Sequence, residues 1–462
     1  MRSLFRKLYK DKAFYKMVLA VALPVMAQNA VSQLVNVLDN LMVGAIGTEQ
    51  MSGVTISNQF IFIFNLCVFG GLSGPGIFGA QYYGKKDAEG IKRIFRLKLW
   101  IAGLLTILAL LLFGLCPDAL IRLFLHESNS ELSLTDTLQS GLSYLRIMLW
   151  GLVPFALSMI YASTLRECRE TLLPMKASMT AVGVNLLGNW LLIGGNLGFP
   201  ALGVKGAAIA TVISRYVELA ILLISVHGKK KRFFYFVGAY DTIRVPWHRA
   251  SHVLIRGLPL LINETLWSGG MTTLNALYST HGLTAVAACN INSTFSNLFN
   301  VVFLSLGSSI GIVVGNLLGD NELKEARETD TAMIAFSVTT CFVMGGLLAS
   351  LSHVFPLMYN TTDEVRSVAS GMLLITAACM PLQAFSQASY FTLRSGGLTG
   401  ITMLMDSGFT WAIAVPAAYI TCRLTGLSLL PCYFIVTFTE IIKVVIGYFC
   451  IRSDRWLKNI TD

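Results

Sequence analysis

Residues 96–116 read RLKLWIAGLLTILALLLFGLC. From Leu99 to Cys116 this stretch carries no charge, and a helix that crosses the hydrocarbon core of a bilayer needs about 20 mostly apolar residues. Comparable stretches recur from residue 17 to residue 450. The composition agrees, because 54% of the residues are apolar and 13% are charged, whereas soluble proteins carry about 25% charged residues. The sequence therefore predicts an integral membrane protein.

The apolar stretches predict an all-α protein of twelve transmembrane helices. Buried helices of a soluble protein would need polar outer faces, which most of these stretches lack. The expected helices are 17–46, 52–82, 96–116, 137–163, 173–196 and 203–226 in the first half, and 253–280, 286–317, 328–353, 363–393, 399–421 and 427–450 in the second.

The net charge is +10, and the Lys and Arg residues that produce it are distributed unequally between the two sides of the membrane. With a cytoplasmic N-terminus, one side holds only Arg122, Arg146, Lys205, Arg366 and Arg423, whereas most of the other Lys and Arg fall in the tails and even-numbered loops. This positive-inside pattern predicts a multi-pass cell-membrane protein with both termini in the cytoplasm. Basic clusters such as 229–232 are then topology signals and contacts to anionic lipids, so no nucleic-acid partner is expected.

The remaining composition predicts neither a cofactor nor an enzyme. No cleavable signal peptide is expected, because the basic N-terminus runs into a full-length helix. The nine Cys are scattered, without CxxC or Cys/His spacing, and are interpreted as small apolar residues. The six His lie in loops or near helix ends, and no nucleophile with a base is found inside the helices.

The two halves of the chain repeat each other. At one constant offset Pro24 matches Pro259, Asn40 matches Asn275 and Gly84 matches Gly319. Six helices in each half give both repeats the same orientation, so we expect two homologous six-helix bundles. The predicted domains are an N-terminal lobe at 1–226, a cytoplasmic linker at 227–252 and a C-terminal lobe at 253–462. Such a duplication favours a transporter that works by alternating access.

The first predicted helix has one polar face that ends in a carboxylate. Gln28, Asn29, Ser32, Gln33, Asn36, Asp39 and Asn40 fall within about 140° of arc on an α-helix. An ionisable group inside a membrane usually faces the bundle interior and serves function. Asp39 is therefore a candidate for binding a proton or Na⁺, helped by Asn36 and by Asn185 and Asn189 of the fifth helix. An interhelical hydrogen-bond anchor is the structural alternative.

The second half carries the candidate substrate residues. Glu264 shares a helix face with Asn275, and Trp267 lies on the neighbouring edge, which suits an organic cation through charge and cation–π attraction. Gln383 adds an amide to the lining of a wet cleft. A shallow Glu264 paired with Arg256 is the alternative.

The sequence assigns no role to three other intramembrane charges, Asp406, Arg215 and Lys443. Asp406 has only Ser407 and Thr410 as polar neighbours in the sequence. Arg215 with Glu218, and Lys443 with Glu440, are spaced three apart, which favours neutralising ion pairs. Residues 74–79, GPGIFG, fit a dinucleotide-binding pattern, but inside an apolar helix they predict close packing or a kink.

Several motifs together resemble the MATE (multidrug and toxic compound extrusion) family. The residues are Leu23-Pro24, Asp39-Asn40-Leu41-Met42-Val43-Gly44 and Gly47 of the first helix, Gln81-Tyr82-Tyr83-Gly84, the pairs Leu165-Arg166 and Leu393-Arg394, and 202–208. The resemblance implies export of organic, often cationic compounds in exchange for Na⁺ or H⁺, and places Asp39 at the family's first-helix aspartate. It departs from one branch of the family where Asn189 replaces an acid, and from another at Gln383.

These observations predict a cation-coupled antiporter that exports small organic, mostly cationic compounds, with Na⁺ or H⁺ as coupling ion and a monomeric state. No metal is expected beyond Na⁺ at Asp39. The alternative is a flippase for a lipid-linked saccharide of the same superfamily, which would need a basic cavity for its phosphates. The intramembrane charges near the expected cleft are acidic, and this favours the antiporter.

Overall fold

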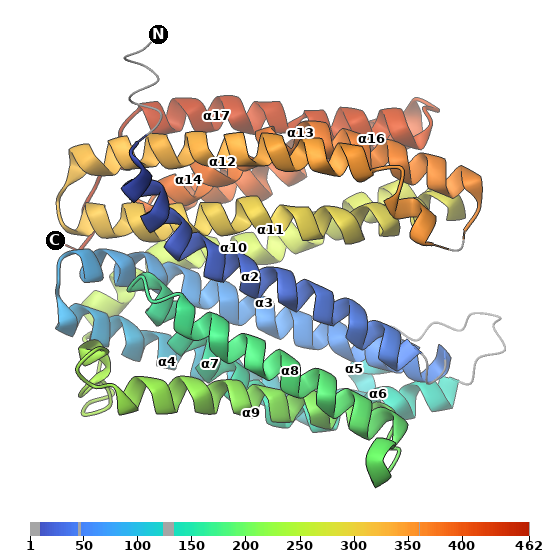
Figure 1. Cartoon of the computed structure of the whole chain (residues 1–462), viewed down its shortest axis with the longest axis horizontal. Coiled ribbons are helices and arrows are strands. Elements are labelled where there is room, and N and C mark those ends of the chain that lie inside the picture. Colours follow the sequence, from blue (N-terminus) through green and yellow to red (C-terminus); the bar gives the residue numbers. More distant parts are fainter. Residues whose placement is uncertain (1–9, 45–47, 123–133, 360, 462) are drawn as a thin grey trace. The chain divides into compact units, whose positions relative to one another are not determined.

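The computed structural model describes residues 10–44, 48–122, 134–359 and 361–461. Within these ranges the chain is helical and contains no strand, and the helices form twelve long runs (Figure 1). The first six are α2 (Lys12–Gly44), α3 (Thr48–Gly84), α4 (Ala88–Leu115), α6 (Leu134–Met148) continued into α7 (Leu152–Glu167), α8 (Leu172–Gly194) and α9 (Val204–Gly228), with the short α5 (Pro117–Arg122) after α4.

The second half begins with α10 (Trp247–Ser279), α11 (Leu283–Gly319), α12 (Leu323–Leu351) and α13 (Asp363–Ser395). The eleventh run starts at α14 (Thr399–Met403), passes through α15 (Val415–Tyr419) and ends in the π turn η7 (Ile420–Leu424), and the twelfth joins α16 (Leu429–Phe438) to α17 (Glu440–Arg452). The predicted all-α fold of twelve helices is confirmed.

Eleven of these runs are long and apolar enough to cross a membrane, among the residues that the model describes. The exception is α10. Its apolar sequence is interrupted by polar residues that include Asn263, Glu264 and Ser268. Because polar side chains in a spanning helix are costly and usually functional, this helix is a place to look for a site.

Residue contacts divide the chain into two compact units. Unit 1 holds the chain up to Met26, Ala80–Asp87 and Leu254–Asp462, and unit 2 holds Ala27–Gly79 and Ala88–Val253. The units follow the two halves of the sequence except for the start of α2 and the end of α3, which pack with the second half. The predicted lobes at 1–226 and 253–462 were defined by the sequence repeat and not by contacts. They therefore stay a prediction.

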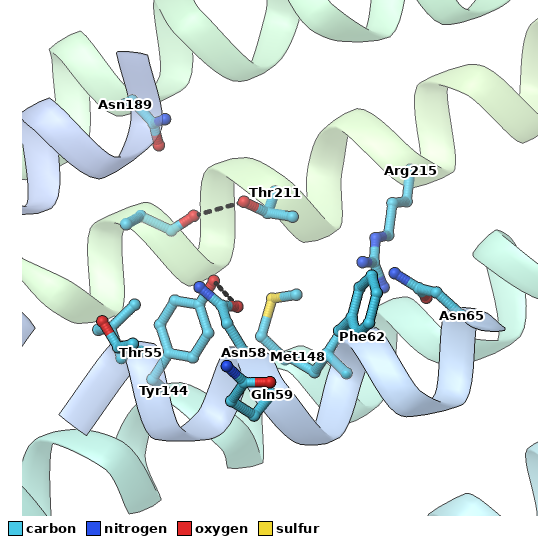
Figure 2. Close-up of a pocket in the computed structure, with 13 residues that line it drawn as sticks. Thr55, Asn58, Gln59, Phe62, Asn65, Tyr144, Met148, Asn189, Thr211 and Arg215 are labelled. Carbon is cyan, nitrogen blue, oxygen red and sulfur yellow. Dashed lines mark hydrogen bonds between the residues drawn. The ribbon is translucent and has the colours of Figure 1, made fainter. Parts of the chain in front are cut away.

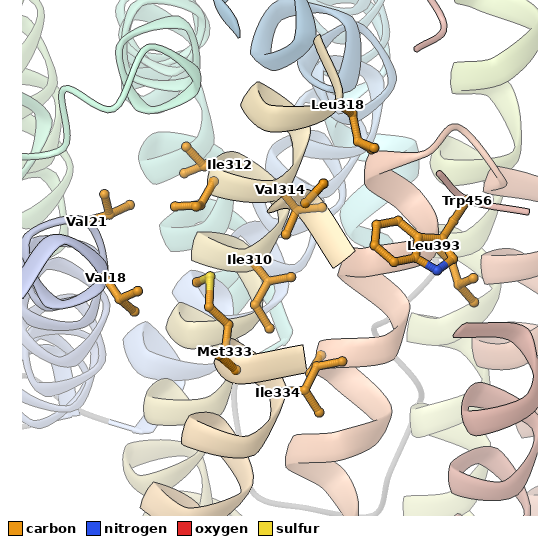
Figure 3. Close-up of a cluster of buried hydrophobic side chains, with 14 of the residues drawn as sticks. Val18, Val21, Ile310, Ile312, Val314, Leu318, Met333, Ile334, Leu393 and Trp456 are labelled. Carbon is orange, nitrogen blue, oxygen red and sulfur yellow. The ribbon is translucent and has the colours of Figure 1, made fainter. Parts of the chain in front are cut away.

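An apolar cluster holds the start of α2 within unit 1 (Figure 3). Val18 and Val21 of α2 belong to the same buried cluster as Ile310 of α11, Met333 of α12 and Leu393 of α13. Inside a membrane protein such contacts stabilise mainly through van der Waals packing, since lipid tails are as apolar as these side chains.

The end of α3 is held in unit 1 by a second, polar contact. Gln81 is fully buried; its Nε2 donates to the carbonyl of Ser395 at 2.9 Å, and its Oε1 accepts from the backbone N–H of Ile460 at 2.8 Å. A Cβ at Gly84 would overlap the carbonyl oxygen of Asn316, and one at Gly319 would overlap that of Gln81. The residues that the duplication makes equivalent therefore pack directly against each other.

A buried ion pair organises unit 2 and explains the glycine pattern at 74–79. Lys98 of α4 is fully buried, and its Nζ donates to Glu167 Oε1 at 2.6 Å and Oε2 at 2.7 Å. A Cβ at Gly76 would lie 2.9 Å from Glu167 Oε1, and one at Gly79 would overlap Oε2. The predicted close packing is confirmed, and it makes room for a carboxylate.

We expect Gly79→Ala to destabilise the protein by about 1–3 kcal/mol, because the added methyl group must displace the Glu167 carboxylate from a closely packed site. The matched control is Gly103→Ala in α4, where an added Cβ meets nothing within 4 Å and the higher helix propensity of Ala should be neutral or stabilising. Thermal unfolding in mild detergent measures both variants, and equal midpoints for them would contradict the packing role of Gly79.

Candidate functional site

Unit 2 contains a cavity of about 560 Å³, within the range of about 300–1,000 Å³ that is typical of small-molecule sites. Four helices contribute to its lining. Its lining residues are Val54, Thr55, Asn58, Gln59, Ile61, Phe62 and Asn65 of α3, Tyr144 and Met148 of α6, Asn189 of α8, and Ala207, Thr211 and Arg215 of α9 (Figure 2). Amides, hydroxyls and one guanidinium therefore face a space that is otherwise apolar.

The α3 wall approaches α6 closely because both helices carry glycine at the contact. A Cβ at Gly53 would lie 2.7 Å from the backbone nitrogen of Gly141. Ser57 Oγ donates to the Gly53 carbonyl at 3.0 Å and the Gly141 carbonyl at 2.9 Å, so the contact is also hydrogen-bonded. Tyr144, one turn along α6, can then donate its hydroxyl to Asn58 Oδ1 at 3.1 Å within the cavity wall.

The predicted amide pair of α8 is buried and connected to the cavity. Asn185 Nδ2 donates to Thr211 Oγ1 at 3.1 Å, and Asn189 Nδ2 donates to Asn185 Oδ1 at 3.4 Å. Asn65, across from them on α3, has a buried Oδ1 without a hydrogen-bond partner among the described residues. Buried amide oxygens are ligands that hard cations accept, and a buried acceptor left without a donor is costly.

Arg215 gives the cavity a positive charge that the sequence analysis assigned to an ion pair with Glu218. The guanidinium Nη1 donates to the carbonyl of Gly151 at 3.1 Å, and its Cζ lies 5.0 Å from the centre of the Phe155 ring. These contacts hold the side chain in the cavity wall, where Figure 2 shows it.

Asp39 and Asn36 lie on α2, but their side chains fall outside the described part of the structure. The assignment of a coupling cation to Asp39 therefore stays a prediction. Of the four residues predicted to bind it, Asn185 and Asn189 are joined to each other by a hydrogen bond.

Unit 1 contains a polar cluster that the sequence analysis did not find. Asp406 Oδ2 accepts from Asn263 Nδ2 at 3.0 Å, and Asp406 Oδ1 lies 3.6 Å from Lys443 Nζ. Lys443 also pairs with Glu440 at 3.0 Å, as the spacing predicted, and lies 4.8 Å from the centre of the Phe409 ring. The cluster joins α10, the eleventh run and α17.

The backbone around Asp406 is wound more widely than an α-helix. Leu404–Gly408 and Thr410–Ala414 are π turns, a form that is rare and common at functional sites. Ser407 stabilises this winding, since its N–H donates to Asn263 Oδ1 at 3.2 Å and its Oγ donates to the Asn263 carbonyl at 2.8 Å. In the sequence, only the intramembrane charges of Asp406 and Lys443 pointed to this cluster.

The predicted substrate residues lie on two helices of unit 1. Glu264, Trp267 and Asn275 are on α10, where Glu264 is half-buried and the other two are exposed. Gln383 is on α13, and its Oε1 is buried without a hydrogen-bond partner among the described residues. Joint binding of a substrate by Gln383 and the α10 residues stays a prediction.

Asn292 of α11 has a structural role. Asn292 Nδ2 donates to the Tyr433 hydroxyl at 3.0 Å, and its Oδ1 accepts from Thr376 at 3.3 Å. Asn300 differs from Asn292, because its Oδ1 is buried and lacks a partner within the described ranges. The duplication aligns Asn300 with Asn65, whose Oδ1 is in the same state, so the repeat keeps this unsatisfied amide oxygen in both halves.

The comparisons with known proteins agree with this architecture. The family model MatE matches residues 24–191 and again residues 259–420. The chain belongs to the MATE family. The two matches begin at Pro24 and Pro259, the residues that the internal duplication aligns, and the predicted resemblance is confirmed.

Two curated relatives extend over nearly the whole of this MATE chain. The probable multidrug resistance protein NorM of Thermotoga maritima is 24% identical over 452 residues, which cover 96% of this chain and 93% of the relative. The probable multidrug resistance protein YoeA of Bacillus subtilis is 22% identical over 433 residues, which cover 92% and 91%.

Solved structures of MATE transporters have the same fold. A crystal structure of MATE in the straight conformation matches with a TM-score of 0.84 at 19% identity, covering 97% of each chain. A transporter of the MOP superfamily from Pyrococcus furiosus, whose binding pocket is described as reversed in polarity, matches with a TM-score of 0.82 at 18% identity over 97% of each chain.

The Asp406–Lys443 pair should show strong energetic coupling, because removal of one partner leaves a charge in a poorly solvated site. We expect Lys443→Met to destabilise this MATE protein, and Asp406→Asn in the same chain to restore part of the loss, with a coupling free energy of about 0.5–3 kcal/mol. Unfolding in mild detergent of the two single variants and the double variant measures it.

The control is the same cycle at Asp118 and Arg122, an exposed pair at 3.0 Å in α5. Water screens exposed pairs, so their coupling should be small. Additive effects of Lys443→Met and Asp406→Asn would show that the two groups do not form an energetically significant pair.

Proposed function

We propose that the chain is a cation-coupled antiporter that exports small organic, mainly cationic, compounds by alternating access, with Na⁺ or H⁺ as the coupling ion. The observation that carries the proposal is the double family match over both halves, together with a cavity in unit 2 lined by polar side chains. The names of the relatives, which describe probable multidrug resistance proteins, support an export function.

The cavity supports the transport of a small molecule. About 560 Å³ is enough for a drug-sized compound, and Phe62, Tyr144 and Met148 provide the apolar and aromatic surface that such compounds need. Neutral amides and hydroxyls can bind chemically different substrates, because each offers both donors and acceptors.

The coupling step is assigned to the N-terminal half. In the proposed mechanism Asp39 binds the cation, and Asn36, Asn185 and Asn189 supply further oxygens. Binding of the cation cancels the carboxylate charge, so the ion favours one conformation over the other and drives release of the substrate. Glu264, Trp267, Asn275 and Gln383 in the second half are proposed to bind the cationic substrate.

The charge distribution supports an orientation with both termini in the cytoplasm, because Lys and Arg concentrate on the side that holds the tails and even-numbered loops. We place the protein in a cytoplasmic membrane, as a monomer in contact with its lipids.

A second function, flipping of a lipid-linked saccharide, is favoured by one observation. Among the described residues that line the cavity, the charged residue is Arg215, and a guanidinium binds phosphate well. The acidic groups Glu264 and Asp406 in unit 1 favour the antiporter.

The coupling role of Asp39 is tested by uptake of a fluorescent organic cation into inverted membrane vesicles under an imposed Na⁺ or H⁺ gradient. We expect gradient-driven accumulation in the wild type and its loss in Asp39→Asn, because the amide cannot change its charge with the ion. Asp118→Asn, which removes an exposed carboxylate of α5, is the control and should accumulate the dye normally. Normal accumulation in Asp39→Asn would remove Asp39 from the coupling step.

The role of Arg215 separates the two functions. For an antiporter of cations, Arg215→Gln should increase the affinity of the cavity for a cationic dye several-fold, because a repulsive charge is removed. For a flippase, the same variant should lose translocation of a lipid-linked phosphate in reconstituted vesicles. Lys205→Gln, at the start of α9 and outside the cavity lining, controls for charge alone.

A further inference from the structure

Three metal-ligand side chains that lie far apart in the sequence meet in unit 1. One ligand atom each of His281, Cys422 and Cys432 lies within 4.8 Å of the other two. His281 is in the turn between α10 and α11, Cys422 is in η7, and Cys432 is in the first turn of α16. Two connections between helices are thus brought together at one point by groups that bind metals.

The chemical state of the three residues leaves them available as ligands. Cys422 and Cys432 are free thiols, and the Cys432 Sγ lies 3.7 Å from the carbonyl oxygen of Leu427. The His281 Nε2 is buried and has no hydrogen-bond partner within the described ranges. A buried ring nitrogen without a partner is unfavourable, and coordination to a cation would remove this cost.

We propose that His281, Cys422 and Cys432 form a Zn²⁺ site. Thiolate and imidazole are the ligands that Zn²⁺ prefers, at about 2.3 Å and 2.0–2.1 Å, and ligand atoms around such a tetrahedral ion lie about 3.5–3.8 Å apart. The observed upper limit of 4.8 Å therefore requires only small side-chain adjustments. Ca²⁺ and Mg²⁺ need several oxygen ligands, which this group does not offer.

The proposed ion completes a packed region and is separate from the cavity in unit 2. Tyr278, three residues before His281, and Tyr433, next to Cys432, pack edge to face with ring centres 5.6 Å apart. Both helices also contribute to one buried apolar cluster, with Leu274 from α10 and Val436 from α16. Zn²⁺ would link the two connections above this cluster, and because it binds only the folded arrangement it stabilises unit 1.

Coordination requires that both thiols lose their protons to solvent as the ion binds. The site therefore has a direct spectroscopic signature. Co²⁺ added to the metal-free protein produces charge-transfer absorption from thiolate to metal, and this absorption disappears when Zn²⁺ displaces the probe. This measurement needs no variant, so it remains informative even where a substitution impairs folding.

The test uses the full-length protein, purified in detergent, stripped with a chelator and then dialysed. We expect one Zn²⁺ per chain by mass spectrometry, the Co²⁺ absorption described above, and a higher thermal midpoint with Zn²⁺ than without it. His281→Gln and the double variant Cys422→Ser, Cys432→Ser should each lower the zinc content at least tenfold. Cys450→Ser, which removes a half-buried thiol of α17, should retain full binding.

Two results would overturn the proposal. The first is an equal zinc content in the wild type, His281→Gln and the double cysteine variant. This result would show an adventitious ion only. The second is a thiol count in the denatured, unreduced wild type that is two lower than in the reduced protein. In that case the metal-free protein would also give no Co²⁺ absorption. That pattern would assign a disulfide to Cys422 and Cys432. Dye transport is measured separately, so failure of the proposed antiport leaves the metal result unaffected.

Discussion

The structure depends first on the absence of water from the hydrocarbon core of a bilayer. A backbone amide there must find its partner within the protein, and a continuous helix supplies one for nearly every residue. The same constraint applies to side chains. Lys98 is accommodated because Glu167 lies within hydrogen-bond distance and glycines leave room for the carboxylate, and Asp406 is accommodated by Asn263 and Lys443. Both charges are thus balanced by a partner inside the protein.

Pairing within the protein also separates structural from functional polarity in this chain. Asn292 is fully engaged by Tyr433 and Thr376, and Gln81 by the backbone of unit 1. Asn65, Asn300 and Gln383 instead keep buried oxygens that no described donor satisfies. All of these amides look alike in the sequence. Only their surroundings show which of them could bind a ligand.

The fold could be predicted from the sequence because helix length, apolar content and the repeat are local or additive properties. The twelve helices followed from these properties, whereas the family resemblance rested on motifs such as Asp39–Gly44 and the Leu-Arg pairs. The site could be predicted only in part. Asn185 and Asn189 lie one turn apart on one helix, so their proximity follows from helical geometry, whereas the Lys98–Glu167 pair, the Asp406 cluster and the His281–Cys422–Cys432 group join helices that are distant in the sequence. No spacing rule finds such contacts, because packing creates them.

The passage of α2 and α3 from one contact unit to the other has a mechanical consequence. α2 changes unit after Met26 and α3 after Gly79, and each helix has a proline a few residues earlier, Pro24 in α2 and Pro75 in α3. Proline removes one backbone hydrogen bond and crowds the preceding turn, so a helix bends there at lower cost than elsewhere. Each of the two helices therefore contains a turn weakened by proline within a few residues of the position where its contacts change from one unit to the other.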